Sequence, residues 1–197
     1  MQTNIRLSRS DIGISEYLSV IKCLRKGMLG MGFEVGKFED LLSNYLNSNV
    51  VCVSSGTAAL HLALESINLE KGSEVLVPSL TYVATFQAIT AAGLIPKSVD
   101  IDPNTGNMSF EYLENAISPK TKVVLPVLYA GDTSHYRKII KWSKDNGLRV
   151  VCDAAHAFGS KDKGQLVGSF GDITCFSFDG IKNITSGEGG CIVSNDS

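Results

Sequence analysis

Residues 50–67 have the sequence VVCVSSGTAALHLALESI, in which a short apolar run leads through a polar turn into a helical pattern. The run at residues 50–53 is typical of a buried strand, and residues 57–67 have the length and pattern of a helix. A strand followed closely by a helix is the repeating unit of α/β proteins. This unit is the basis of the expected fold.

The strand–helix unit recurs towards the C-terminus. Further strand-like runs lie at residues 74–77, 95–99, 122–127 and 148–152. Helical patterns alternate with them at residues 82–92, 109–117 and 134–145. Alternation at this spacing predicts an α/β fold with a mostly parallel sheet covered by helices on both faces.

Both ends of the chain depart from this alternation. Two helical patterns, at residues 13–26 and 36–46, precede it and are joined by a glycine-rich connection. From residue 172 onward, strand-like runs at residues 173–178 and 191–193 follow each other with no helix between them. We therefore expect part of the sheet to be antiparallel.

The composition narrows the possible functions. The chain is 44% hydrophobic and 19% charged, with a formal net charge of −2 and no run of basic residues. Such a balance gives no electrostatic reason to expect nucleic acid or a membrane surface as a partner. The five cysteines form no Cys-x-x-Cys pair, so neither a disulfide framework nor a zinc site is indicated. The N-terminus lacks the apolar core of a signal peptide, and no apolar run approaches the roughly 20 residues that span a bilayer, so we expect a cytoplasmic protein.

Ligands of open α/β sheets bind at the carboxyl ends of the strands, and the first of these ends carries Gly56 and Thr57. Gly56 allows close approach of the backbone, Thr57 offers a hydroxyl, and the following helix would point its N-terminus at the same spot. This combination predicts a phosphate site. An ordinary Ser/Thr helix cap is the alternative. The pattern matches neither a P-loop nor Gly-x-Gly-x-x-Gly, which disfavours nucleotide-binding folds of those types.

Two further strand ends carry an aromatic ring and a carboxylate. Tyr82 begins the next helical pattern, where its ring could stack on a planar cofactor or serve as a core or interface residue. Asp153 follows an apolar run, so its carboxylate needs a partner such as a protonated pyridine nitrogen. The alternatives for Asp153 are a helix cap or a Mg²⁺ ligand, and for His156 a structural histidine. Asp-x-x-His alone is a weak metal motif, and we predict no metal site.

The run CFSFDGIKNITSGEGG at residues 175–190 contains Lys182, with Ser177 five residues before it as a second candidate phosphate donor. A lysine at the end of buried strands can act as a neutral amine and form a Schiff base with an aldehyde. The alternative is a solvated loop lysine. A phosphate cradle, an aromatic ring, a carboxylate for a ring nitrogen and a lysine for an aldehyde together indicate pyridoxal 5′-phosphate (PLP).

These segments resemble the DegT/DnrJ/StrS-type family of nucleotide-sugar aminotransferases, within the fold-type-I group of PLP enzymes. The resemblance covers nearly the whole chain, and it is carried by residues 30–38, 55–60, 78–85, 153–156 and 177–190.

The resemblance implies a role for each candidate residue. Lys182 would carry the cofactor and move the proton, and Asp153 would keep the ring nitrogen protonated. Tyr82 would stack on the ring, and His156 would lie near the ring substituents. Gly56, Thr57 and Ser177 would bind the phosphate.

The implied reaction moves an amino group from an amino-acid donor, usually glutamate, to a nucleotide-linked keto sugar. Its setting would be surface-polysaccharide, lipopolysaccharide or related sugar biosynthesis, and the enzyme would be a homodimer.

The chain departs from the family pattern in three ways. Family members are about twice as long, so residues 1–197 would comprise the N-terminal segment and most of the PLP-binding large domain, with the C-terminal small domain missing. Asp179 stands three residues before Lys182, where its carboxylate could pair with the amine and oppose its chemistry. Leu128 occupies a position that is often His in the family.

Two other functions stay open. A sugar dehydratase of the same family commonly has histidine in place of the lysine, so Lys182 favours amino transfer. A catalytically silent PLP-binding fragment is favoured by the short length and opposed by the intact set of residues. A nucleotide-binding domain with Mg²⁺ on Asp153 ranks below both.

Overall fold

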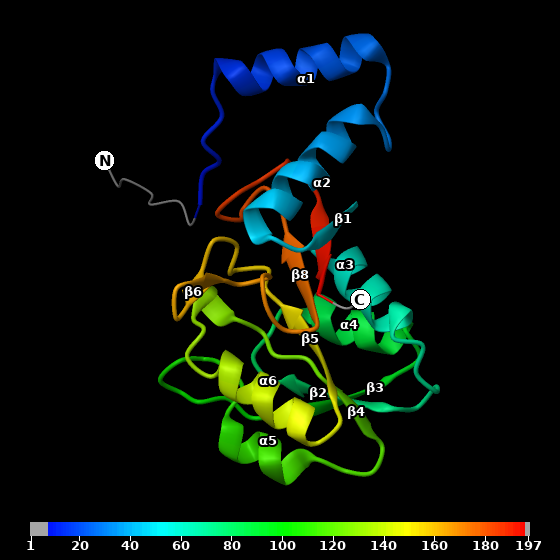
Figure 1. Ribbon diagram of the computed structural model, residues 1–197, viewed down its shortest axis with the longest axis vertical. Coiled ribbons are helices and arrows are strands. Elements are labelled where there is room, and N and C mark those ends of the chain that lie inside the picture. Colours follow the sequence, from blue (N-terminus) through cyan, green and yellow to red (C-terminus); the bar gives the residue numbers. More distant parts are fainter. Residues whose placement is uncertain (1–7, 196–197) are drawn as a thin grey trace, which may run out of the picture.

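The computed structural model describes residues 8–195. A seven-stranded sheet crosses the molecule, with the strand order β1-β9-β8-β5-β4-β2-β3 (Figure 1). The strands are β1 (Asn49–Val53), β2 (Glu74–Pro78), β3 (Ile95–Val99), β4 (Thr121–Val124), β5 (Arg149–Asp153), β8 (Ile173–Ser177) and β9 (Gly190–Ser194).

The directions of the strands agree with the prediction of a mostly parallel sheet. The pairings β2–β3, β2–β4, β4–β5 and β5–β8 are parallel. β9 runs antiparallel to both of its neighbours, β8 and β1. Because β9 reverses the direction, β1 and β8 run the same way, and the carboxyl ends of six of the seven strands in this sheet face one side.

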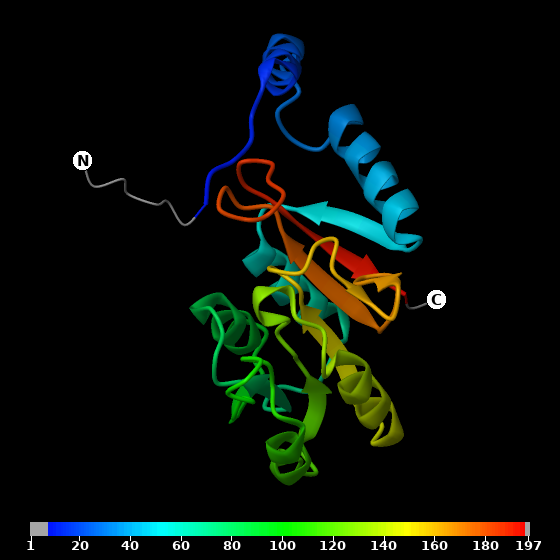
Figure 2. The same cartoon turned by 90° about the vertical axis from the view of Figure 1, so that its left-hand side faces the viewer.

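Helices cover both faces of the sheet. The helices are α1 (Ile14–Lys26), α2 (Phe33–Leu46), α3 (Gly56–Ser66), α4 (Val83–Ala91), α5 (Phe110–Ala116) and α6 (Tyr136–Asp145). One face packs against α3 and α4, and the opposite face packs against α2, α5 and α6 (Figure 2). The predicted fold class is therefore confirmed.

The pleat of the strands explains why both faces are covered. In β2, Val75 and Val77 pack under α3 and α4, whereas Leu76 between them packs towards α5 and α6. Successive side chains of a strand point to opposite faces, so an uninterrupted apolar strand buries both faces only if both are covered. All three side chains are fully buried.

Local details differ from the sequence predictions. α2 begins at Phe33, three residues earlier than expected, and α6 begins at Tyr136, two residues later. A small hairpin of β6 (Lys161–Asp162) and β7 (Gln165–Leu166) was not predicted. It turns through Lys163 and Gly164, which both have positive φ angles, as a two-residue hairpin turn of type I′ requires.

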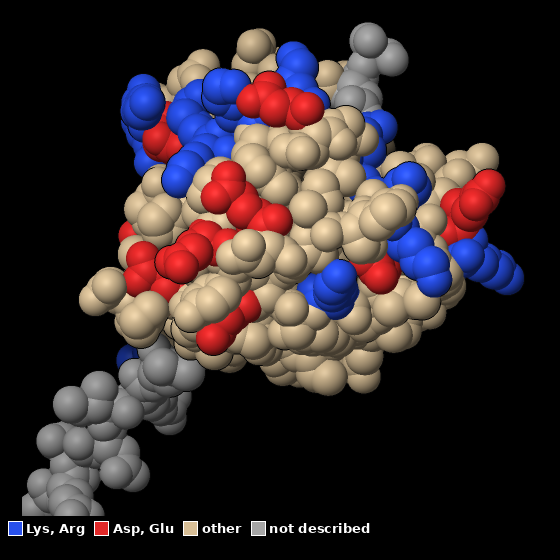
Figure 3. Space-filling view, turned by 90° about the horizontal axis from the view of Figure 1, so that it is seen from below, with Lys and Arg blue, Asp and Glu red and all other residues tan. Residues whose placement is uncertain are grey.

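α1 extends away from the sheet in both views, and none of its residues is buried (Figures 1 and 2). On the face seen in Figure 3, basic side chains form separate groups with acidic side chains among them. Between residues 8 and 195, no helix combines the length and the apolar character needed to cross a membrane.

Candidate active site

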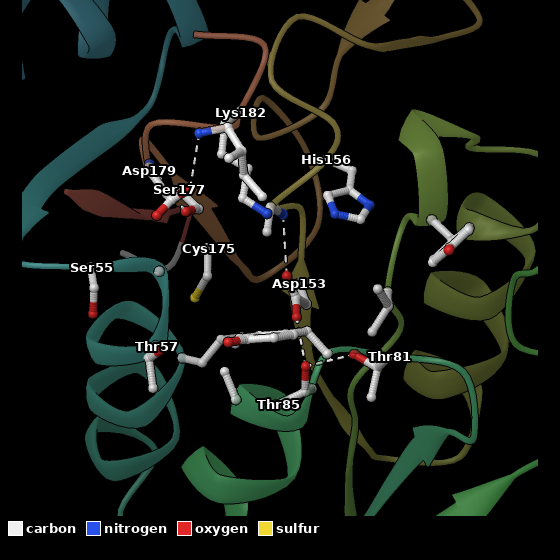
Figure 4. Close-up of a pocket in the computed structure, with 18 of the residues that line it drawn as sticks. Ser55, Thr57, Thr81, Thr85, Asp153, His156, Cys175, Ser177, Asp179 and Lys182 are labelled. Carbon is white, nitrogen blue, oxygen red and sulfur yellow. Dashed lines mark hydrogen bonds between the residues drawn. The ribbon is translucent and has the colours of Figure 1, made fainter. Parts of the chain in front are cut away.

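A cavity of about 550 Å³ opens at the carboxyl ends of β5 and β8, beside the first turns of α3 and α4 (Figure 4). Its walls include every residue that the sequence singled out for the cofactor: Gly56, Thr57, Tyr82, Asp153, His156, Ser177 and Lys182. The fold thus brings together residues that are up to 126 positions apart, from 56 to 182. Their individual roles stay predictions.

The pleat of the two central strands aims polar groups into this cavity. Val151 of β5 and Ile173 and Cys175 of β8 belong to the core beneath α3 and α4. Side chains two residues further along each strand face the same way, which places Asp153 and Ser177 on that face. Both end their strands, so they meet the helix N-termini instead of the apolar core.

The N-terminus of α3 forms a tight cradle with the end of β8. Ser55 caps the helix, its Oγ accepting a hydrogen bond of 3.1 Å from the N–H of Ala58. A Cβ atom on Gly56 would lie 2.8 Å from Cβ of Ser177, so only glycine fits there without displacing the strand. The N–H groups of Gly56 and Thr57, in the first turn, have no partner within the helix and suit an anion.

Asp153 is a buried carboxylate with two fixed donors. The side chain of Thr85 donates to Oδ2 at 2.9 Å, and the N–H of Ala155 donates to Oδ1 at 3.1 Å. Only 5% of Asp153 is exposed. Burial raises the pKa of this carboxyl, while the bonds from Thr85 and Ala155 and the charges of His156 and Lys182 act in the opposite direction.

Lys182 extends its side chain from the turn after β8 towards Asp153 and His156 (Figure 4). The N–H of Lys182 donates to the carbonyl of Asp179 at 3.0 Å, which forms the turn. The base of the loop is closed by Phe178, whose N–H donates to the carbonyl of Gly189 at 2.8 Å. A rigid loop base therefore directs a single amine into the cavity.

The carboxylate of Asp179, expected to be able to pair with this amine, has another partner. Its Oδ1 accepts the N–H of Ile181 at 2.9 Å. Among the ion pairs of residues 8–195, none joins Asp179 to Lys182. Asp179 thus caps the turn that presents the lysine.

His156 lies at the other wall. Its Nδ1 accepts the N–H of Ala130 at 3.4 Å, and its ring packs edge-on against Tyr129 with centroids 5.6 Å apart. Burial, and secondly the charge of Lys182, lower the pKa of His156. The lowered pKa favours the neutral imidazole, the form whose Nδ1 can accept the N–H of Ala130.

Tyr82 and Leu128 have different surroundings. Tyr82 precedes α4, is 76% exposed and borders the cavity, so its ring is free to cover a ligand. Leu128 is buried in the core between α2, α6 and the sheet, and it does not line the cavity. Its difference from the family pattern therefore concerns packing beside the site.

Several cavity residues were not predicted from the sequence. Thr85 and Thr81 lie on the wall beside Asp153, and Leu80, Tyr129, Ile181 and Glu188 complete the rim. Thr81 and Thr85 are four positions apart at the start of a helical pattern. Thr85 lies in the first turn of α4 and Thr81 just before the N-cap Tyr82, so helical spacing does not relate the two, and the sequence does not say which element either of them faces.

Comparison with known proteins gives this geometry a context. The sequence profile described as the DegT/DnrJ/EryC1/StrS aminotransferase family matches residues 11–197. The chain is 48% identical over 144 residues to GDP-perosamine synthase of Escherichia coli O157:H7, a match that covers 73% of this chain and 40% of that protein. The chain spans about half the length of the curated relatives it matches.

Solved structures show the same fold. The PLP-form of Spr1654 from Streptococcus pneumoniae, described as a sugar aminotransferase, superposes with a TM-score of 0.92 at 37% identity, over 99% of this chain and 54% of that chain. A PMP-form of that protein is also similar. GDP-4-keto-6-deoxy-D-mannose-3-dehydratase of E. coli, with bound hydrated PLP, has a TM-score of 0.92 at 30% identity, over 98% of this chain and 51% of that chain.

Proposed function

Because the chain belongs to the DegT/DnrJ/EryC1/StrS aminotransferase family, we propose that the full-length protein transfers an amino group from glutamate to a keto sugar linked to a nucleotide. The observation that carries this proposal is the meeting of Lys182, Asp153 and the cradle of Gly56 and Ser177 in one cavity. The similarity to GDP-perosamine synthase supports a nucleotide-linked sugar as the acceptor.

The family's cofactor is PLP, as predicted, and the residues of this chain fit it. A single Cβ atom at position 56 would fill the cradle. Because Gly56 has no Cβ, the N–H groups of the first turn stay accessible to a phosphate. Asp153 is a buried acceptor for a protonated ring nitrogen, and Lys182 reaches the same space. When bound, PLP supplies an aldehyde that takes up the amino group and a ring that withdraws electrons.

Each side chain would then have a defined task. Asp153 would hold a proton on the ring nitrogen through a charge-assisted hydrogen bond. Lys182 Nζ would bind the cofactor and, once free, move a proton at the reacting carbon. Gly56, Thr57 and Ser177 would hold the phosphate, Tyr82 would cover the ring, and His156 would contact its substituents as a neutral imidazole.

A sugar dehydratase is the second candidate, because a dehydratase is among the similar structures. Dehydration requires a group that removes a proton. It does not require a lysine amine in the active site. Lys182 stands in the cavity with its amine directed at Asp153 and His156, which favours amino transfer.

The setting of the reaction is part of the proposal. Residues 1–197 would make up the N-terminal segment and most of the PLP-binding large domain of a homodimer. The five cysteines are unpaired, as is usual in the reducing cytoplasm, and we place the enzyme there. Its product would serve surface-polysaccharide or lipopolysaccharide assembly.

A labelled-nitrogen assay tests the proposal on the full-length protein. With ¹⁵N-glutamate and GDP-4-keto-6-deoxy-D-mannose, we expect ¹⁵N in the sugar product, and a Lys182→Ala variant should lose transfer by about 10³-fold or more. A Lys163→Ala variant, changed in the exposed β6–β7 turn, is the matched control. A deoxygenated sugar without ¹⁵N would establish the dehydratase, and unchanged transfer by Lys182→Ala would overturn the role of the lysine.

A further inference from the structure

We propose that Thr85 is a positioning residue for Asp153. Thr81 in turn orients the hydroxyl of Thr85, so that two hydroxyl groups form a relay to the carboxylate. This inference rests on the proposed function, because it assigns Asp153 the task of holding a ring nitrogen protonated. Thr85 lies in the first turn of α4, while Asp153 ends β5. The relay therefore joins a helix to a strand 68 positions away in the sequence.

The contacts form a continuous chain away from the carboxylate. Oγ1 of Thr85 is 2.9 Å from Oδ2 of Asp153, and Oγ1 of Thr81 is 2.7 Å from Oγ1 of Thr85. Thr85 is fully buried, whereas Thr81 is half-buried on the cavity wall. The middle hydroxyl is thus shielded from water, and its bonds are confined to these two partners (Figure 4).

The chemistry of the groups fixes the direction of the relay. An ionised carboxylate only accepts hydrogen bonds, so the single proton of Thr85 points at Asp153. The oxygen of Thr85 then has only lone pairs to offer, and the bond between the two threonines must be donated by Thr81. Hydrogen bonds in such a chain polarise one another and strengthen the last one, on the charged group.

The relay leaves the carboxylate with one orientation. Thr85 holds Oδ2, and the N–H of Ala155 holds Oδ1, so rotation of the Asp153 side chain would break both bonds. The backbone donor comes from the same loop as Asp153, whereas Thr85 ties the carboxylate to a separate helix. Thr85 is therefore the contact that sets the position of the carboxylate relative to the wall formed by α4.

The relay also opposes the effect of burial on the charge. The titratable groups that interact with Asp153 are Lys182 and His156 from the cavity and Cys152 and Cys175 from the strands, and Tyr82, Asp179 and Glu188 line the same cavity. Burial raises the pKa of Asp153, and the Thr85 bond is the largest of the influences that lower it. Burial also raises the pKa values of both thiols, so they stay neutral and add no competing charge at neutral pH.

The test uses isosteric substitutions in the cofactor-free, full-length protein. Thr85→Val removes the hydroxyl but keeps the branched shape, and Thr85→Ser keeps the hydroxyl. Thr90→Val is the matched control on the same helix, because the Thr90 hydroxyl is exposed and bonds only to the carbonyls of Phe86 and Gln87. The readout is the ¹³C-carboxyl signal of labelled aspartate, followed against pH, with Asp153 assigned by the signal missing in Asp153→Asn.

We expect Asp153 to bind a proton roughly tenfold more tightly in Thr85→Val than in the wild type, the effect of losing one hydrogen bond to a charged group. Thr85→Ser and Thr90→Val should titrate like the wild type, and Thr81→Val should show a smaller change in the direction of Thr85→Val. An unchanged Asp153 titration in a folded Thr85→Val protein would overturn the inference.

The result of the Asp153 titration does not depend on the result of the ¹⁵N transfer assay that tests the proposed function. The titration is made without PLP or substrate, so it reports the relay even if the ¹⁵N transfer assay fails. Where transfer is present, Thr85→Val should lower kcat about tenfold or more while the KM for glutamate changes little, because the fully buried Thr85 presents no exposed surface to the donor. An equal loss in Thr90→Val would instead indicate a general effect on α4 and contradict the positioning role.

Discussion

Asp153 ends β5 and Lys182 follows β8 at the same edge of the sheet, and the cost of burying a charge in this arrangement falls on Asp153. Burial removes its carboxylate from water, and only two hydrogen bonds and two nearby cationic or titratable groups offset that loss. A site that keeps a costly charge for chemistry is expected to be less stable than the same site without the charge. This trade-off can be measured.

An Asp153→Asn variant should be more stable than the wild type at neutral pH, in the absence of cofactor. Because the pKa of Asp153 is raised in the folded protein, its protonated form stabilises the fold fully below the unfolded-state pKa of about 3.9, and that contribution is lost as the pH rises through the folded-state pKa. Asparagine does not titrate and loses nothing. Urea denaturation between pH 3 and pH 8 should show a gain for the variant at pH 7 that disappears near pH 3.

The control for this experiment is Asp40→Asn, on the exposed side of α2. It should show no such pH-dependent gain. If Asp153→Asn were less stable than the wild type at pH 7, the hydrogen bonds to the carboxylate would outweigh its burial, and the expected sign of the stability change would be wrong.

The side chains also show where prediction from sequence ends. Asp153, Lys182 and Gly56 could be found because strand ends of an α/β sheet meet at one edge, a rule that needs only the order of elements. Thr85 could not, because its role depends on which side of α4 faces β5. Asp179 was expected near the amine for its position in the sequence, yet a local bond to the N–H of Ile181 decides its orientation.

The first turn of α3 has a side-chain cap next to the proposed phosphate site, and the contribution of this cap to stability can be measured. Ser55 caps the helix, and the neighbouring N–H groups border the cavity. Ser55→Ala should reduce the free energy of unfolding by about 1 kcal/mol through loss of the cap. Ser66→Ala, in the last turn of the same helix, is the control, because its hydroxyl only bonds to the carbonyl of Ala63 and lies near the surface.

Chemical denaturation of the two variants, compared with the wild type, checks this prediction. A change of about 0.5 kcal/mol or less is expected for Ser66→Ala, as for most surface substitutions. Equal destabilisation by both variants would mean that the cap contributes nothing beyond ordinary hydroxyl packing.

All strands of the seven-stranded sheet were predicted, whereas the short pair β6–β7 was not. The pair β6–β7 has only two residues per strand, and no apolar alternation marks it. Its signal was the turn sequence Asp162-Lys163-Gly164-Gln165, in which Lys-Gly supplies the two positive φ angles. The antiparallel β9 was anticipated because no helix separates it from β8, so the chain has no crossover with which to return parallel.

Within residues 8–195, one amphipathic helix has an apolar side that no other element buries. α1 has exposed apolar side chains along one side, at Ile14, Tyr17, Leu18, Val20, Ile21 and Leu24, and none of its residues is buried. A helix of 13 residues is only marginally stable in water on its own, and its apolar side normally packs against a partner. The relatives are about twice as long, so in the full-length protein further chain or a second subunit is expected to cover this side.

Residues 1–197 by themselves should therefore associate with one another as their concentration rises, because exposed apolar surface of this extent is stabilised by contact. Sedimentation velocity from about 1 to 100 μM is the measurement, a range in which weak apolar contacts become populated. The double variant Leu18→Ser and Ile21→Ser should shift the association to at least tenfold higher concentration. Ser19→Ala, on the polar side of α1, should leave it unchanged. A wild-type chain that stayed monomeric throughout, with α1 still helical by hydrogen exchange, would show that this side of α1 needs no cover.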